Sequence, residues 1–154
     1  MAKTVFLFSG QGSQYVGMGK ELCEAYPDID VYARASEILG FDLAEKINNS
    51  TEEELAQTVI SQPAIMATSL VAFEIMKKNG IEFSAVAGHS LGEYAAMVAS
   101  GVLSFEDGFK VIKARAQAKK DRNYAEADRI RGELLAKGVE LTDTKEGTTF
   151  KILS

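Results

Sequence analysis

The strongest indication of the fold is AVAGHSLGE at residues 85–93. A short run of small and β-branched residues ends at Gly88, and an apolar helical pattern begins at Leu91. Between them stands G-x-S-x-G, a pattern typical of a nucleophilic serine on a sharp turn from a strand into a helix. The first N–H groups of such a helix point to where negative charge develops when the serine attacks a carbonyl. The pattern therefore predicts that Ser90 is a nucleophile.

The residues around Ser90 form the turn itself. Small flanking residues let the chain fold back on itself, which is the role expected of Gly88 and Gly92. His89 directly precedes the serine, and side chains of adjacent residues diverge at such a turn. His89 is therefore predicted to be structural, lining the pocket or packing under the turn, rather than a general base. Glu93 is likewise expected to be a solvated or structural acid.

A second glycine-rich segment lies near the N-terminus. Residues 4–8 (TVFLF) predict a buried strand, and a loop over 9–14 (SGQGSQ) follows it. Neither a phosphate-loop lysine nor a third dinucleotide-binding glycine follows at the required offset. The loop is either a permissive turn or a segment beside the Ser90 turn that lends a backbone N–H to an oxyanion hole.

The order of the predicted elements indicates the fold class. Helical patterns cover residues 18–26, 28–39, 64–78, 91–100 and 105–115, with Pro63 expected at the first helical position of the third. A further helix start is expected after residue 51, and a second strand over 83–87. Strands alternating with helices predict an α/β fold with a parallel sheet and the serine at the carboxyl end of a strand.

Composition limits the classes of function. The 154 residues, 46% of them hydrophobic, suffice for a packed core, and the net charge of −5 argues against broad nucleic-acid binding. A single cysteine, Cys23, excludes an internal disulfide, and its helical spacing predicts a core position. Without an apolar run of about 18 residues or a signal-peptide pattern, the chain is expected to be soluble and cytoplasmic, with no membrane partner.

Several separated motifs, in order, resemble those of one family. They are FSGQGSQ at 8–14, VGMG at 16–19, SQPA at 61–64, AGHSLGEY at 87–94, ASGV at 99–102 and Arg115. On these motifs, residues 5 to about 115 resemble the N-terminal part of the malonyl-CoA:acyl carrier protein transacylases. The resemblance implies a truncated α/β-hydrolase-like acyltransferase core with parallel strands and a nucleophile elbow.

The same resemblance implies a reaction and its residues. Ser90 would be acylated by malonyl-CoA and would pass the acyl group to the phosphopantetheine thiol of acyl carrier protein, in fatty acid biosynthesis. The backbone amides of Gln11 and Leu91 would form the oxyanion hole. Arg115 would pair with the malonyl carboxylate, which a planar guanidinium binds bidentately. No metal and no cofactor apart from these substrates is implied.

Beyond Arg115 this resemblance ends, and with it the family's catalytic histidine. Residues 116–154 instead resemble the extreme C-terminus of cysteinyl-tRNA synthetase, with a helix from Asn123 to Gly138 and a hairpin of 139–144 with 148–153 around 145–147. The chain is thus divided into a partial acyltransferase core, 1–115, and a helix-plus-hairpin tail, 116–154. The tail either caps the core or contacts tRNA.

Three functions remain open from the sequence. The first is an acyltransferase-type enzyme whose activity is impaired by the lack of a histidine base. The second is a non-catalytic module that binds CoA or a carrier protein, or a half-site that a partner chain completes. The third is contact with tRNA through the tail. A truncated parallel sheet leaves an edge and an apolar face open, which a homo-oligomer would cover.

Overall fold

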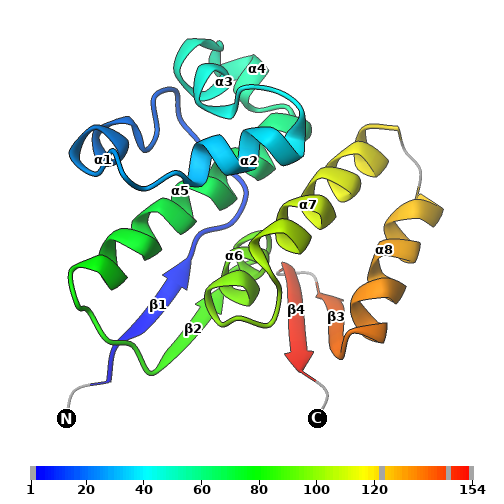
Figure 1. Ribbon diagram of the computed structural model, residues 1–154. Helices are drawn as coiled ribbons and strands as arrows, with labels where there is room; N and C mark the ends of the chain where they lie inside the picture. Colours follow the sequence, from blue (N-terminus) through cyan, green and yellow to red (C-terminus); the bar gives the residue numbers. More distant parts are fainter. Residues whose placement is uncertain (1–2, 122–123, 145–146, 153–154) are drawn as a thin grey trace.

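The computed structural model describes residues 3–121, 124–144 and 147–152, and Figure 1 shows their arrangement. In chain order the elements are β1 (Val5–Phe8), α1 (Lys20–Ala25), α2 (Val31–Leu39), α3 (Leu43–Asn49), α4 (Glu52–Leu55), α5 (Thr58–Lys78), β2 (Ala85–Gly88), α6 (Gly92–Ala99), α7 (Phe105–Lys120), α8 (Tyr124–Ala136), β3 (Val139–Thr144) and β4 (Gly147–Ile152). The predicted α/β class with parallel strands is confirmed.

The parallel sheet brings the two glycine-rich segments of the sequence together. β1 and β2 pair in register from Val5 opposite Ala85 to Phe8 opposite Gly88. Parallel strands end at the same edge of a sheet, so the loop after Phe8 and the turn after Gly88 leave that edge side by side. The five intervening helices, α1 to α5, form the crossover between the two strands.

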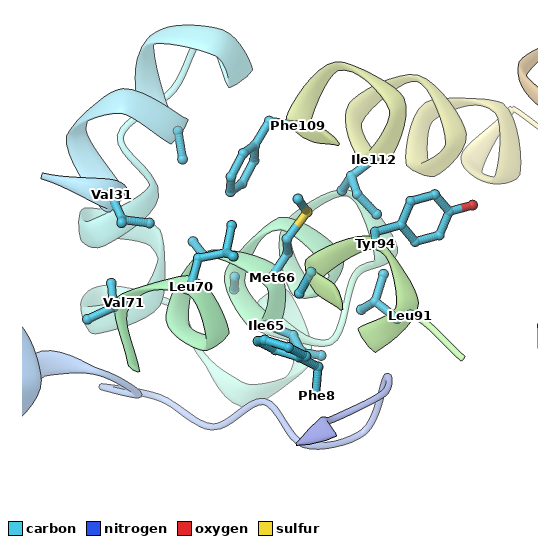
Figure 2. Close-up of a cluster of buried hydrophobic side chains, with 14 of the residues drawn as sticks. Phe8, Val31, Ile65, Met66, Leu70, Val71, Leu91, Tyr94, Phe109 and Ile112 are labelled. Atoms are coloured by element: carbon cyan, nitrogen blue, oxygen red, sulfur yellow. The ribbon is translucent and has the colours of Figure 1, made fainter. Parts of the chain in front are cut away.

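Helix α5 is the centre of the core. It packs against α2, α3, α6 and α7, and its middle is buried throughout, from Ser61 to Ala67. Figure 2 shows Met66 and Leu70 of this helix in the interior with Phe109 of α7. By length and composition α5 could also span a membrane, but most of its apolar stretch is buried, as in the core helix of a globular protein.

One face of the parallel sheet is covered by aromatic side chains. Phe73 of α5 lies 5.8 Å from Phe6 and 6.1 Å from Phe8, between ring centroids, and Phe83 lies 5.0 Å from Phe6. Such ring contacts add about 0.5–1.5 kcal/mol each beyond the burial of their area. This cluster holds the sheet on α5.

The opposite face of the sheet is open. Val5 is 47% exposed and Leu7 is 79% exposed, and their β2 neighbours Ala85 and Ala87 are exposed as well. The prediction of a buried strand over 4–8 is therefore wrong for every second residue. The strand forms as predicted, but among the described residues no layer packs on this second face.

One helix begins earlier than predicted, and another was not predicted. α5 begins at Thr58, so Pro63 lies inside the helix and not at its first position. Burial of Pro63 and its neighbours in the core outweighs the hydrogen bond that a proline cannot donate. α3 was not predicted; Asp42 caps it by accepting from the backbone N–H of Glu45 at 2.9 Å, and Leu43 and Ile47 anchor it in the core.

The tail folds as a helix followed by a hairpin. α8 packs against α7 and β3, and β3 pairs antiparallel with β4 from Val139 opposite Ile152 to Thr144 opposite Gly147. The predicted domain boundary at Arg115 falls inside α7, which continues to Lys120. Asn123, the predicted start of the tail helix, and part of the predicted turn lie outside the described residues.

The two faces of β1 give a matched test of this arrangement. Phe8→Ala is expected to lower the free energy of unfolding by about 3–5 kcal/mol, because Phe8 is buried, whereas Leu7→Ala should cost less than about 0.5 kcal/mol. Urea denaturation of dilute protein measures both. Equal losses would contradict the open face, since they would show that Leu7 is covered in solution.

Candidate active site

Ser90 sits at the tip of a strained turn between β2 and α6. Its φ of 53° makes it the one residue other than glycine with a left-handed backbone in the described parts of the chain. The His89 N–H donates to the Phe8 carbonyl at 3.0 Å, and the Gly92 N–H donates to the His89 carbonyl at 3.0 Å. Together these bonds fix both sides of the serine. This is the conformation of a nucleophile elbow, as the sequence predicts.

The glycines of the elbow have no room for a side chain. A Cβ on Gly88 would lie 2.3 Å from the Glu93 backbone nitrogen. A Cβ on Gly92 would lie 2.2 Å from the Phe8 carbonyl oxygen. The first contact lets α6 fold back over the end of β2, and the second lets it pass the end of β1. The predicted roles of both glycines therefore have a steric reason.

The loop after β1 lies against the elbow. A Cβ on Gly10 would stand 2.7 Å from the His89 carbonyl oxygen and 3.5 Å from the Ser90 Cβ. The next residue, Gln11, contacts α5. The buried Gln62 of that helix donates a hydrogen bond from its Nε2 to the Gln11 Oε1 at 3.4 Å. Gln11 thus directly follows the residue that contacts the elbow.

Leu91 completes the predicted oxyanion pair. Its side chain is buried under the turn, and its backbone already has helical angles where α6 begins. N–H groups at this end of a helix lack partners within the helix. The oxyanion roles of the Gln11 and Leu91 amides stay predictions.

His89 and Glu93 flank the elbow and differ in exposure, and the structural role of His89 stays a prediction. His89 is exposed, and its Nδ1 lies over Gly10, 2.9 Å from where a Cβ of that residue would stand. Glu93 is buried, not solvated, in the first turn of α6, where the partial positive charge of the helix end favours a carboxylate.

Arg115 is connected to the helix that begins at the elbow. This half-buried side chain of α7 donates a hydrogen bond from Nη1 to the Tyr94 hydroxyl, and its guanidinium carbon lies 5.4 Å from the centroid of the Tyr94 ring. Tyr94 belongs to α6 and is 2% exposed. Sequence reasoning missed this tyrosine as a site residue, because its spacing is that of an ordinary core position. The carboxylate-binding role of Arg115 stays a prediction.

Other features of the surface lie apart from the elbow. An open groove of about 810 Å³ runs between α2 and α7. Arg34, Phe105 and Lys113 are among the residues that line it, but Ser90 and Arg115 do not line it.

Within the described ranges, no three His, Cys, Asp or Glu side chains lie close enough together to hold a metal ion. Cys23 is half-buried, and its burial raises the pKa of the thiol.

A family of known proteins matches most of this chain. The model of the acyl transferase domain family matches residues 5–142. The chain is 45% identical over 118 residues to the malonyl CoA-acyl carrier protein transacylase of Bacillus subtilis and 40% identical over 120 residues to that of Haemophilus influenzae. Each alignment covers 76% of this chain, but only 37% and 38% of the two relatives. The chain therefore spans less than two fifths of their length.

Solved structures share the fold. The acyl carrier protein S-malonyltransferase of Vibrio cholerae superposes with a TM-score of 0.71 at 42% identity, over 75% of this chain and 39% of that one. The malonyl CoA-acyl carrier protein transacylase of Clostridium perfringens superposes with a TM-score of 0.73 at 34% identity, over 97% of this chain and 53% of that one. The fold predicted from the elbow and its flanking elements is thus confirmed.

The packing at the elbow predicts opposite effects for two glycines in helices. Gly92→Ala should cost at least about 2 kcal/mol of stability, because its Cβ meets the backbone of Phe8. Gly132→Ala in α8, where a Cβ meets nothing within 4 Å, should instead add about 0.5–1 kcal/mol. Thermal and urea unfolding measure both. A Gly92→Ala protein as stable as the parent would show that the two strand ends are not packed as described.

Proposed function

The chain belongs to the acyl transferase domain family, and on that premise we propose that it is an acyltransferase-type protein in which Ser90 accepts an acyl group from malonyl-CoA. The observation that carries the proposal is the left-handed backbone of Ser90 at the end of a parallel strand, with Gly10 packed against the elbow. A residue other than glycine held in the left-handed region costs about 1–3 kcal/mol, and such strain is concentrated at functional sites.

The proposed acylation is a nucleophilic substitution at the thioester. The Ser90 oxygen forms a bond to the malonyl carbonyl carbon, and the N–H groups of Gln11 and Leu91 stabilise the resulting oxyanion. The carbon–sulfur bond then breaks, and the serine proton ends on the CoA thiol. The phosphopantetheine thiol of an acyl carrier protein would reverse these steps and remove the malonyl group. Arg115 would hold the malonyl carboxylate, and no metal or further cofactor is needed.

The proposed chemistry is slow in this chain alone. The only histidine of the 154 residues is His89, whose Nδ1 lies over Gly10, and we infer that it does not act as the base because side chains of adjacent residues diverge at such a turn. Loss of general-base assistance typically lowers a rate by about 10²–10⁴-fold. The oxyanion hole and the helix end would still support acylation of the serine. A cytoplasmic setting and a place in fatty acid synthesis follow from the same proposal.

The open face of the sheet favours a second candidate, a half-site that a partner chain completes. Parallel sheets are normally covered on both faces, yet Leu7 is 79% exposed and Val5 47% exposed. A partner, either a second copy or another acyltransferase-type chain, would bury this face. Such a module would bind CoA or a carrier protein without efficient turnover of its own.

For the tail we favour a capping role over contact with tRNA. Arg129 of α8 is paired with Glu126 and Glu133 on its own helix, so its charge is largely neutralised. The Lys137 Nζ forms an ion pair with the Asp107 carboxylate of α7 at 3.2 Å, which links the tail to the core. In this proposal the tail resembles the C-terminus of cysteinyl-tRNA synthetase in sequence, but it serves to cap the core and not to bind tRNA.

Intact-mass spectrometry after incubation with malonyl-CoA tests the first candidate. We expect a malonyl adduct at up to one equivalent, formed slowly, that is absent from Ser90→Ala. Ser84→Ala, which removes an exposed serine before β2, is the matched control and should keep the adduct. A folded parent protein without any adduct would refute acylation by this chain alone.

Sedimentation velocity over a range of concentrations tests the second candidate. A partner-completed half-site predicts association that Leu7→Lys weakens, because a charge would be placed on the buried face, while Lys3→Ala next to the strand should change little. A monomer at every concentration, alone and mixed with a full-length family member, would rule this candidate out.

A further inference from the structure

We propose that the Tyr94 hydroxyl is a positioning residue for carboxylate recognition, because it holds the Arg115 guanidinium in one orientation. This inference rests on the proposed function, since it takes Arg115 as the group that meets the malonyl carboxylate. The sequence pattern does not assign this role to the tyrosine. The role is inferred from the contact that Tyr94 of α6 makes with Arg115 of α7.

The contact combines two fixed elements. Tyr94 is 2% exposed and lies in the first turn of α6, the helix that follows Ser90, so its ring cannot swing away. Its hydroxyl accepts the hydrogen bond from Arg115 Nη1, and the guanidinium carbon stands 5.4 Å from the ring centroid. A hydrogen bond and a cation–π contact from the same side chain restrict both the position and the tilt of the guanidinium.

This arrangement leaves one edge of the guanidinium available. Arginine has five N–H donors, and the Nη1 contact with Tyr94 uses one of them. Within residues 3–121, 124–144 and 147–152, the Nε and Nη2 groups of Arg115 donate to no protein acceptor. These two groups lie on the same side of the guanidinium and form the fork that binds a carboxylate bidentately.

An arginine held in one orientation raises the affinity for acyl groups that carry a carboxylate more than the affinity for acyl groups without one. A free arginine side chain loses rotamer freedom when it binds a ligand, and a side chain already ordered by Tyr94 loses less. The benefit applies only to an acyl group that carries a carboxylate. Tyr94 should therefore increase the preference for malonyl-CoA over acetyl-CoA without changing the affinity for the CoA part that both share.

A merely structural brace between α6 and α7 would behave differently. Loss of its hydrogen bond would lower stability and would weaken both ligands to the same extent. The ratio of the two affinities therefore separates positioning from bracing, and Tyr94→Phe is the suitable change because it keeps the ring and removes only the hydroxyl.

The experiment measures equilibrium binding of malonyl-CoA and acetyl-CoA by calorimetry in a Ser90→Ala background, where no acylation occurs. We expect the parent to prefer malonyl-CoA, and the added Tyr94→Phe change to reduce that preference by about tenfold, the effect of one hydrogen bond to a charged group. Arg115→Gln in the same background should abolish the preference.

Tyr32→Phe is the matched control, because Tyr32 is the other tyrosine whose hydroxyl is shown bonded in the interior of the described chain. It donates to the Met18 carbonyl at 3.0 Å and lies 2.6 Å from the Thr68 hydroxyl, and burial raises its pKa to about 12. Its loss should leave the malonyl preference unchanged.

Three results would overturn the inference: no malonyl preference in the Ser90→Ala parent, an unchanged preference in Tyr94→Phe, or a parallel loss of both affinities. Failure of the proposed function is a separate result, because it appears as absence of the Ser90 adduct. The preference in binding does not depend on acylation.

Discussion

The close approach of α6 to the ends of both strands is the constraint on which the rest of this structure depends. Gly92 faces the Phe8 carbonyl and Gly88 faces the start of α6 at distances that only a hydrogen atom can occupy. This packing turns the chain so sharply that Ser90 takes a left-handed backbone directly after the end of β2. Any larger residue would move the helix away from the strands and remove the geometry that the chemistry needs.

The core supports this turn from one side. Helix α5 carries the Phe73 contacts that hold the sheet, and its Gln62 reaches the loop on the other side of the serine. The elbow, the loop and the central helix are thus one packed unit. The second face of the sheet contributes nothing comparable, because the exposed Leu7 and Val5 have no described layer above them. The face of the sheet that packs on α5 therefore contributes both the buried core and the support of the candidate site.

Helix α7 joins the site to the tail. Arg115 contacts Tyr94 of α6 near the middle of α7, and the helix then continues to Lys120 without a break. α8 packs on α7, and Lys137 pairs with Asp107 near its start. Arg115, at the predicted boundary of the tail, is therefore held by contacts within the core.

The elbow was predictable from the amino-acid sequence, because a serine between two glycines after a strand pattern and before a helix pattern has few other conformations. The α/β class was predictable too, and so were the helix ends at Gly40 and Gly101, where both glycines take positive φ angles. The packing of the folded chain, by contrast, sets which strand face is buried, since alternation in TVFLF is absent and both faces are apolar. It also decided that Pro63 lies inside α5 and that Tyr94 holds Arg115, because both depend on burial and on contacts between residues far apart in the chain.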